Sequence, residues 1–245
     1  MIRVSIIIAT YNSGRTIRKA LNSVVNQIFQ EWECLIIDGL SKDNTLQIVK
    51  EFAEKDKRIK YISEKDEGIY DAFNKGWKMA QGEWIHYLGS DDWLTKESFC
   101  KFFVNDEFLT SGTAVMSGNV YRVTRKGDLQ IVASHGWNGG HQAKLTRRNI
   151  LLHYNGFNNK YKYLADAELM YRMKKEGCTI VNVDTIVAYY SYGGASEKIS
   201  HQVEMAKERL SFYKLDNNIK NRYFLVMKKF IIGVASIIKT QICGR

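Results

Sequence analysis

Apolar and polar positions follow a repeating pattern over the first 95 residues. Short β-branched runs, typical of buried strands, are separated by segments with apolar residues at helical spacing. The runs predict strands at residues 4–10, 33–38, 59–63 and 83–88. Helices are predicted within 13–30, through 48–52 and over 69–80. Because strands and helices alternate, the pattern indicates a parallel sheet with helices on both faces.

Beyond Trp93 this alternation weakens. Strands are predicted at 114–120, 121–124, 129–133 and 179–190, with a turn at 125–128, and helices at 145–153 and 164–175. From Ser200 the pattern is helical to near the end. We therefore expect an α/β fold, a Rossmann-like, mostly parallel sheet flanked by helices, in one domain over 1–215 with a helical extension over 216–245.

Charge and cysteine usage narrow the class of protein. The formal net charge is +10, and residues 220–245 contain six basic residues and no acidic one. Such a chain favours an anionic partner: nucleic acid, an acidic membrane or a phosphorylated substrate. The alternative is a merely solvated basic surface. The four cysteines, Cys34, Cys100, Cys178 and Cys243, form no C-x-x-C pair, so we expect them to be reduced in a cytoplasmic protein.

Acidic residues follow two predicted strands. Asp38 ends one strand, and Asp91 and Asp92 come just after another. In a parallel sheet both sites lie at the carboxyl edge, where ligands bind. Carboxylates gathered there repel one another unless a cation compensates, and their hard oxygens suit Mg²⁺ or Mn²⁺ on a diphosphate. The alternative is that Asp91 or Asp92 caps a helix after Trp93.

The turn after the first strand argues against a dinucleotide site. Residues 9–14 read Ala-Thr-Tyr-Asn-Ser-Gly, without the G-x-G-x-x-G pattern, and no P-loop occurs. Tyr11 offers a flat face that can stack on a nucleobase. A partly buried aromatic at a strand end explains Tyr11 equally well.

Several motifs together resemble family 2 glycosyltransferases of the GT-A fold, most closely the bacterial branch that builds O-antigen, capsule and exopolysaccharide. Between residues 3 and 200 the motifs occur in the family's order and spacing. They are Val4–Asn12, the Ile36-Ile37-Asp38-Gly39 segment with Ser41, Asp43 and Thr45, the segment 66–76 (DEGIYDAFNKG), Leu88–Asp92, Gly139–Gln142, Ala165–Leu169 with Arg172, and Gly193–Ser196. The chain departs from the family at Gly89, which replaces a leading acid of the metal motif, and at Ala165, which replaces a Glu.

The resemblance assigns roles to individual residues. Thr10, Tyr11 and Asn12 form the base-binding turn, with Tyr11 stacked on the base and Asp38 bonded to base or ribose. Asp71 lines the nucleotide pocket, Asp91 touches the ribose, and Asp92 ligates Mn²⁺ or Mg²⁺. Asp166 is the catalytic base of an inverting displacement. His141 reaches the phosphates or the acceptor.

Some of these residues have plain structural alternatives. Asp71 and Asp166 both fit carboxylates at a helix start, and His141 fits a structural histidine. Glu33, Trp84 and His86, together with the stretch around Trp137, are candidates for an acceptor groove, and nothing in the sequence ranks them.

The resemblance implies transfer of a hexose or N-acetylhexosamine from a nucleoside diphosphate sugar to a glycan or undecaprenyl-diphosphate-linked acceptor. UDP is the first choice of carrier, ahead of GDP and dTDP. Residues 1–95 would be the nucleotide-binding half and 96–215 the acceptor-binding half. The alternatives are a sugar nucleotidyltransferase and a basic nucleic-acid-binding protein, and the acidic sheet edge argues against the second.

The C-terminal segment fits peripheral contact with the inner face of the plasma membrane. Apolar residues recur at helical spacing and basic residues flank them; the apolar set is Tyr223, Phe224, Met227, Phe230, Ile231, Val234 and Ile238, and the basic set is Lys220, Lys228, Lys229 and Lys239. Such a helix can lie in a membrane interface and attract anionic lipid. The alternative is a helix packed on the domain or on a second subunit, and the oligomeric state stays open.

Overall fold

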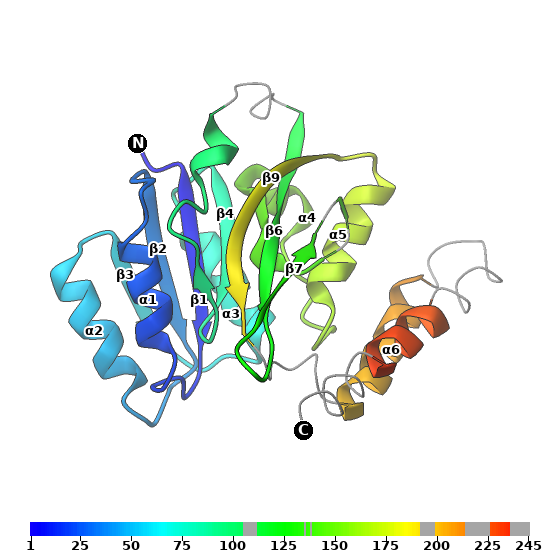
Figure 1. The fold of residues 1–245 in the computed structure, drawn as a ribbon, viewed down its shortest axis with the longest axis horizontal. Coiled ribbons are helices and arrows are strands. Elements are labelled where there is room, and N and C mark those ends of the chain that lie inside the picture. The colour runs from blue at the N-terminus through cyan, green and yellow to red at the C-terminus, as the bar shows by residue number, and fades with distance from the viewer. Residues whose placement is uncertain (105–111, 135, 138, 192–198, 214–225, 236–245) are drawn as a thin grey trace.

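The computed structural model describes residues 1–104, 112–134, 136–137, 139–191, 199–213 and 226–235. The predicted α/β class is confirmed, with one nine-stranded sheet flanked by helices (Figure 1). The first half contains the predicted alternation, with small shifts at the element ends. Its elements are β1 (Val4–Thr10), α1 (Ile17–Val25), β2 (Trp32–Asp38), α2 (Thr45–Lys55), β3 (Ile59–Ser63), α3 (Ile69–Met79) and β4 (Trp84–Gly89).

The second half mixes strand directions. Its elements are β5 (Trp93–Leu94), η1 (Cys100–Phe103), β6 (Thr113–Val123), β7 (Leu129–Ala133), η3 (His141–Ala143), β8 (Lys144–Arg147), α4 (Arg148–Tyr154), α5 (Ala165–Lys175), β9 (Thr179–Tyr190) and α6 (Ile199–Tyr213). The strand order is β3-β2-β1-β4-β8-β6-β9-β5, with β7 paired to β6. The first four strands are parallel, whereas β8 runs antiparallel to both β4 and β6.

Register brings the ends of the parallel strands together. Thr10 pairs with Asp38, and Ala9 pairs with Gly89, so β1, β2 and β4 end at the same edge. The predicted acidic positions at 38, 91 and 92 therefore share the carboxyl edge of the sheet.

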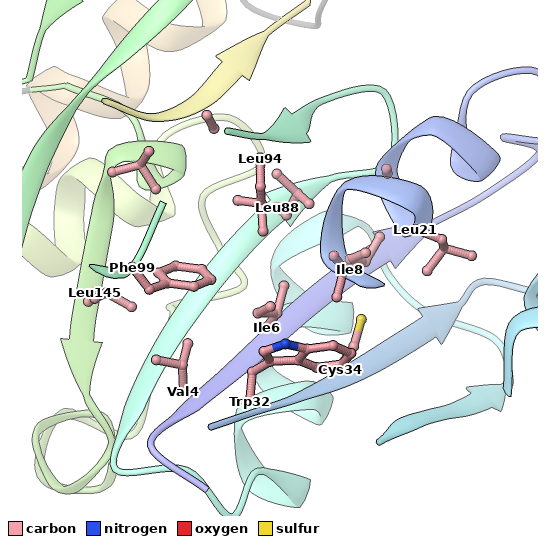
Figure 2. Close-up of a cluster of buried hydrophobic side chains, with 14 of the residues drawn as sticks. Val4, Ile6, Ile8, Leu21, Trp32, Cys34, Leu88, Leu94, Phe99 and Leu145 are labelled. Carbon is pink, nitrogen blue, oxygen red and sulfur yellow. The ribbon is translucent and has the colours of Figure 1, made fainter. Parts of the chain in front are cut away.

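Two cores fill the two faces of the sheet. On one face, Ile6 and Ile8 pack with residues of α1, α2 and η1, and Figure 2 shows Leu21 of α1, Trp32 of β2 and Phe99, just before η1, in this cluster. On the other face, Ile7 packs with residues of α3, α4 and α5. Burial on both faces explains why β1 is an unbroken apolar run rather than an alternating one.

Three sequence predictions about elements were wrong. Residues 114–124 form one long strand, β6, and not two. The helix predicted at 145–153 begins only at Arg148, because Leu145 lies in β8, where it pairs with Met116. The residues directly after Asp92 are not helical, because Trp93 lies in β5 and pairs with Tyr189, so Asp91 and Asp92 are not helix caps. In each case distant strand pairing overrides local spacing.

The proposed acceptor-groove residues Glu33, Trp84 and His86 are core residues. Each is at most 1% exposed. Glu33 accepts hydrogen bonds from Ser5 Oγ and from the Gln81 N–H. Burial lowers the pKa of His86 to about 4, so it is neutral. These side chains stabilise the fold and cannot touch an acceptor.

The C-terminal region is helical where the structure describes it. Helix α6 and the helical residues 226–235 lie beside one another at one end of the molecule (Figure 1). Val226 is buried, while Met227, Ile231 and Ile232 are more than half exposed. The described part of the chain contains no helix long and apolar enough to span a bilayer. Residues 193–196, Tyr223, Phe224, Ile238 and Cys243 lie outside the described residues, and the other three cysteines are free thiols.

Candidate functional site

The loops after β1 and β2 are pinned together at the carboxyl edge. The backbone N–H of Asn12 donates to Ser41 Oγ (2.8 Å), and the N–H of Lys42 donates to Asn12 Oδ1 (2.8 Å). Asn12 has a φ of 50°, a left-handed conformation that asparagine tolerates. The turn holds Tyr11 with 60% of its surface exposed, so its ring face is available to a ligand.

Asp38 is fully buried beside this turn. Its carboxylate accepts hydrogen bonds from the Ser41 N–H (3.1 Å) and from the Ser63 hydroxyl (2.6 Å), and the Ser41 hydroxyl adds a third. Thr10, which faces the same edge, is also buried, and the Gly39 N–H donates to its carbonyl (2.9 Å). Both oxygens of Asp38 are engaged, so its contact with a base or ribose stays a prediction.

Asp92 lies in the turn between β4 and β5 and is only 2% exposed. The Ser191 N–H donates to its Oδ1 (2.8 Å), and Gln142 Nε2 donates to its Oδ2 (3.1 Å). Burial, with the neighbouring charge of Asp91, raises the pKa of Asp92 to about 6. Two hydrogen bonds therefore do not compensate for its burial, and the carboxylate favours a nearby cation.

The two aspartates of this turn fit a divalent cation. A Cβ at Gly89 would lie 2.7 Å from Asp92 Oδ2 and 2.9 Å from Asp91 Oδ1, so both carboxylates converge on this glycine. Hard oxygen donors of this kind suit Mn²⁺ and Mg²⁺. No cluster of three or more His, Cys, Asp or Glu side chains occurs within the described ranges. Asp91 and Asp92 are thus the side chains of this turn that could hold such a cation.

Asp166 occupies the first turn of α5. Its carboxylate accepts hydrogen bonds from Tyr70 Oη (2.9 Å) and from the Ala167 N–H (2.8 Å), and it lies 3.4 Å from His141 Nδ1. Burial acts to raise its pKa, but the hydrogen bonds from His141, Tyr70 and the Ala167 N–H outweigh it, so the pKa lies below its ordinary value. The side chain is 21% exposed. Asp166 is thus ionised, reachable and able to accept a proton.

The short helix η3 joins the two aspartate sites. His141 contacts Asp166, and the next residue, Gln142, donates to Asp92. Two carboxylates separated by more than 70 residues in the sequence are therefore held by consecutive side chains. The buried Asp92 and the ionised Asp166 therefore belong to one site.

A small pocket adjoins Asp166. Tyr87, His141, Lys144 and Met170 are among the residues that line it. Among the described residues, neither Tyr87 Oη nor His141 Nε2 has a hydrogen-bond partner. Burial lowers the pKa of Lys144 to about 8, although the charge of Asp166 acts in the opposite direction. The pocket thus presents donors and acceptors next to Asp166.

Asp71 is a carboxylate at the start of a helix, which is the structural alternative that the sequence left open. It lies in the first turn of α3 and accepts hydrogen bonds from the Glu67 N–H (3.1 Å) and from Asn159 Nδ2 (3.2 Å). Lys75 Nζ lies 3.6 Å away. A contact between Asp71 and a nucleotide stays a prediction.

Sequence reasoning missed several residues of this site. Tyr70 and Gln142 lie inside motifs that the sequence showed, and their positions beside Asp71 and His141 were the only signal. Ser191, Tyr87 and Lys144 carried no signal at all, because nothing in their local sequence indicates contact with Asp92 or proximity to Asp166.

The sequence of this chain matches a known family and a known enzyme. A model of the family described as glycosyl transferase family 2 matches residues 5–173. The chain is 28% identical over 253 residues to the "PGL/p-HBAD biosynthesis glycosyltransferase" of Mycobacterium bovis (strain BCG / Pasteur 1173P2), covering 98% of this chain and 96% of that protein.

Solved structures share the fold. Residues 1–349 of S. aureus TarS match with a TM-score of 0.67 at 21% identity, covering 98% of this chain and 73% of that one, and TarS also matches in its complex with UDP-GlcNAc. The mannosyltransferase PcManGT from Pyrobaculum calidifontis, in complex with GDP-Man and Mn²⁺, matches with a TM-score of 0.67 at 14% identity, with coverages of 98% and 73%. At such low sequence identities, these matches establish a shared fold only.

Proposed function

Since the chain belongs to glycosyl transferase family 2 and is a glycosyltransferase, we propose that it transfers a hexose or N-acetylhexosamine from a nucleoside diphosphate sugar to an acceptor sugar hydroxyl with inversion. The observation that carries this proposal is the joining of Asp92 and Asp166 by Gln142 and His141. A donor site with a cation and a base for the acceptor must be adjacent, and the contacts of Gln142 and His141 support such a pairing of Asp92 with Asp166.

The donor would bind at the carboxyl edge of β1, β2 and β4. In this proposal Tyr11 stacks on the base, Thr10 and Asn12 shape the turn, Asp38 and Asp71 border the nucleoside, and Asp91 lies at the ribose. Asp92 would hold Mn²⁺ or Mg²⁺, which neutralises the charge that builds on the departing diphosphate. UDP is the first candidate carrier, since the matched structures of TarS, which shares the fold, include complexes with UDP and with UDP-GlcNAc.

Asp166 would act on the acceptor. Its carboxylate takes the proton as the acceptor oxygen attacks the anomeric carbon and the bond to the diphosphate breaks. Proton acceptance becomes favourable as the attacking oxygen gains positive character in the transition state. One base on the face opposite the leaving group gives direct displacement and inversion. In this proposal residues 1–95 serve the donor and 96–215 serve the acceptor.

A test of the donor site is thermal unfolding with UDP, GDP, dTDP or CDP, each with and without Mn²⁺, for wild type and Asp92→Ala. A ligand at one hundred times its dissociation constant adds about 2.7 kcal/mol, or about 5–10 °C for a chain of this size. We expect a manganese-dependent rise with one nucleotide that Asp92→Ala loses.

Asp184→Ala is the matched control, because Asp184 is an exposed aspartate on β9. This variant should keep the nucleotide-dependent rise. No rise with any nucleotide, together with stabilisation by a DNA or RNA oligomer, would overturn the proposal in favour of nucleic-acid binding.

The acceptor is proposed to be a lipid-linked oligosaccharide of bacterial surface polysaccharide synthesis, reached from the cytoplasmic face of the membrane. Residues 226–235 support this, because they present Met227, Ile231 and Ile232 with Lys228 on an exposed surface. Apolar side chains beside basic ones favour an anionic interface.

Vesicle sedimentation tests this membrane contact. The double variant Ile231→Ser/Ile232→Ser should lose binding to vesicles of phosphatidylglycerol, whereas Leu129→Ser/Ile131→Ser, which changes exposed residues of β7, should bind as wild type does. Equal binding by both double variants would count against the membrane role of the C-terminal segment.

A further inference from the structure

The carboxylate of Glu208 on α6 binds three consecutive backbone N–H groups. The N–H of Lys162 donates to Oε1 (2.7 Å), that of Tyr163 donates to Oε2 (3.1 Å) and Oε1 (3.3 Å), and that of Leu164 donates to Oε2 (2.9 Å). Helix α5 begins at Ala165, and the side chain of its N-cap residue, Leu164, makes no capping hydrogen bond. Glu208, more than 40 residues further along, thus binds N–H groups that lead directly into this helix.

Residues 162–164, which Glu208 binds, are connected to Asp166 through Tyr70 and through the chain itself. The carbonyl of Tyr163 lies 3.0 Å from Tyr70 Oη, and the same hydroxyl lies 2.9 Å from Asp166. Asp166 itself is two residues beyond Leu164. A shift of residues 162–164 would therefore move both Asp166 and a carbonyl that aligns the tyrosine hydroxyl.

Helix α6 is held in place by buried apolar packing. Phe212 is 1% exposed, and its ring centroid lies 5.7 Å from those of Tyr161 and Tyr171, which flank the bound segment and Asp166 on either side in the sequence. Met205 and Leu164 belong to the same buried cluster. Burial of these apolar side chains fixes Glu208 opposite its three N–H partners.

Residues 226–235 pack in turn on α6. A Cβ at Gly233 would lie 2.3 Å from Gln202 Oε1, so the backbone at Gly233 lies directly against the Gln202 side chain of α6. Burial lowers the pKa of Lys229, and the positive charges of Arg209 and Lys174 add to the effect. The segment proposed to meet the membrane is therefore in direct contact with the helix that carries Glu208.

We propose that Glu208 is a positioning residue: its carboxylate holds the backbone of residues 162–164 and so sets the orientation of Asp166, which makes α6 part of the support of the catalytic base. This inference rests on the proposed function for the role of Asp166. It gives α6 a role at the site that is separate from any membrane contact of residues 226–235.

The test compares Glu208→Gln with Glu204→Gln in the full chain. Glutamine keeps the size of Glu208 but offers one neutral acceptor oxygen in place of two charged ones. Glu204, one turn earlier on α6, is half exposed and pairs only with Lys207 in the described contacts, so it is the matched control. Hydrogen–deuterium exchange of the amides of residues 162–164 should quicken at least tenfold in Glu208→Gln and stay unchanged in Glu204→Gln.

A second measurement separates positioning from plain structural support. Carboxyl-carbon NMR titration, with the signal assigned through Asp166→Asn, reports the pKa of Asp166 directly. Loosening of residues 162–164 weakens the hydrogen bond from Tyr70, so the pKa of Asp166 should rise in Glu208→Gln, by about one unit. Loss of the Glu208 charge alone would shift it downward, so the sign distinguishes the two effects.

The outcomes are separable from those of the proposed function. Unchanged exchange at residues 162–164, or a pKa of Asp166 that stays constant or falls, overturns the positioning role of Glu208. A wild-type protein that no nucleotide stabilises with Mn²⁺ overturns the proposed function, even where Glu208→Gln moves both readouts as expected.

Discussion

Asp92 and Asp166 are the same residue type in two parts of one site, and their pKa values shift in opposite directions. Burial acts to raise both. At the β4–β5 turn, Asp92 receives two hydrogen bonds and lies beside the charge of Asp91, and its pKa rises to about 6. At the start of α5, Asp166 is bonded by Tyr70, the Ala167 N–H and His141, and its pKa falls below the ordinary value.

The difference shows that partners, and not burial alone, decide what a buried carboxylate can do. Asp92 lacks compensation for its charge, which a divalent cation would supply. Asp166 has its compensation built from protein groups, so it is ionised without any metal. The first arrangement suits a ligand for a cation, and the second suits a base.

The strongest test of this comparison is Asp166→Asn. An amide cannot take the proton of the acceptor, so we expect turnover to fall by about 10²–10⁴-fold. Release of the nucleoside diphosphate from the sugar nucleotide that stabilises the protein measures turnover. The manganese-dependent rise in Tm with nucleotide should persist, because the donor side is unchanged. If this variant turned over as fast as wild type, Asp166 could not be the catalytic base.

Asp92→Asn tests the other side of the comparison through stability. The pKa of Asp92 is raised in the folded state, so folding favours its protonated form and the free energy of unfolding falls as pH rises from about 4 to about 6. With EDTA at pH 7.5, Asp92→Asn should therefore be more stable than wild type by about 1–3 kcal/mol.

Urea unfolding at pH 7.5 and at pH 4 measures this gain, which should nearly vanish at the lower pH. Asp184→Asn, an exposed change on β9, is the control and should stay within about 0.5 kcal/mol of wild type at both pH values. A destabilised Asp92→Asn at pH 7.5 would mean that Gln142 and Ser191 already compensate for the charge.

The smallest effect is expected from Tyr70→Phe. It removes one hydrogen bond to Asp166, so stability should fall by about 0.5–1.5 kcal/mol and the pKa of Asp166 should rise. The acidic limb of the pH–rate profile should then move to higher pH. Tyr154→Phe is the matched control, because it removes a tyrosine hydroxyl that donates to Glu176 instead. An identical pH profile in the two variants would contradict a role for Tyr70 at Asp166.

The two halves of the chain differ in how far they could be predicted from the sequence. From β1 to β4 each element is formed by its own residues, since apolar runs of five to seven residues make strands and 3.6-residue spacing makes helices. In the second half, β8 and β5 have four and two residues, too few for a periodic signal, and they exist because β4, β6 and β9 pair with them. The same distant pairing made Leu145 a strand residue.

The sequence by itself determined the α/β class, the acidic positions at the end of β2 and just after β4, and the place of Asp166 in the first turn of a helix, because each depends on residues adjacent in the chain. Only the tertiary structure decided which groups surround those carboxylates. Ser191 reaches Asp92 across 99 residues, and Tyr70 reaches Asp166 across 96. The opposite pKa shifts arise from these distant partners, because charge and hydrogen bonding act through space while periodicity acts only along the chain.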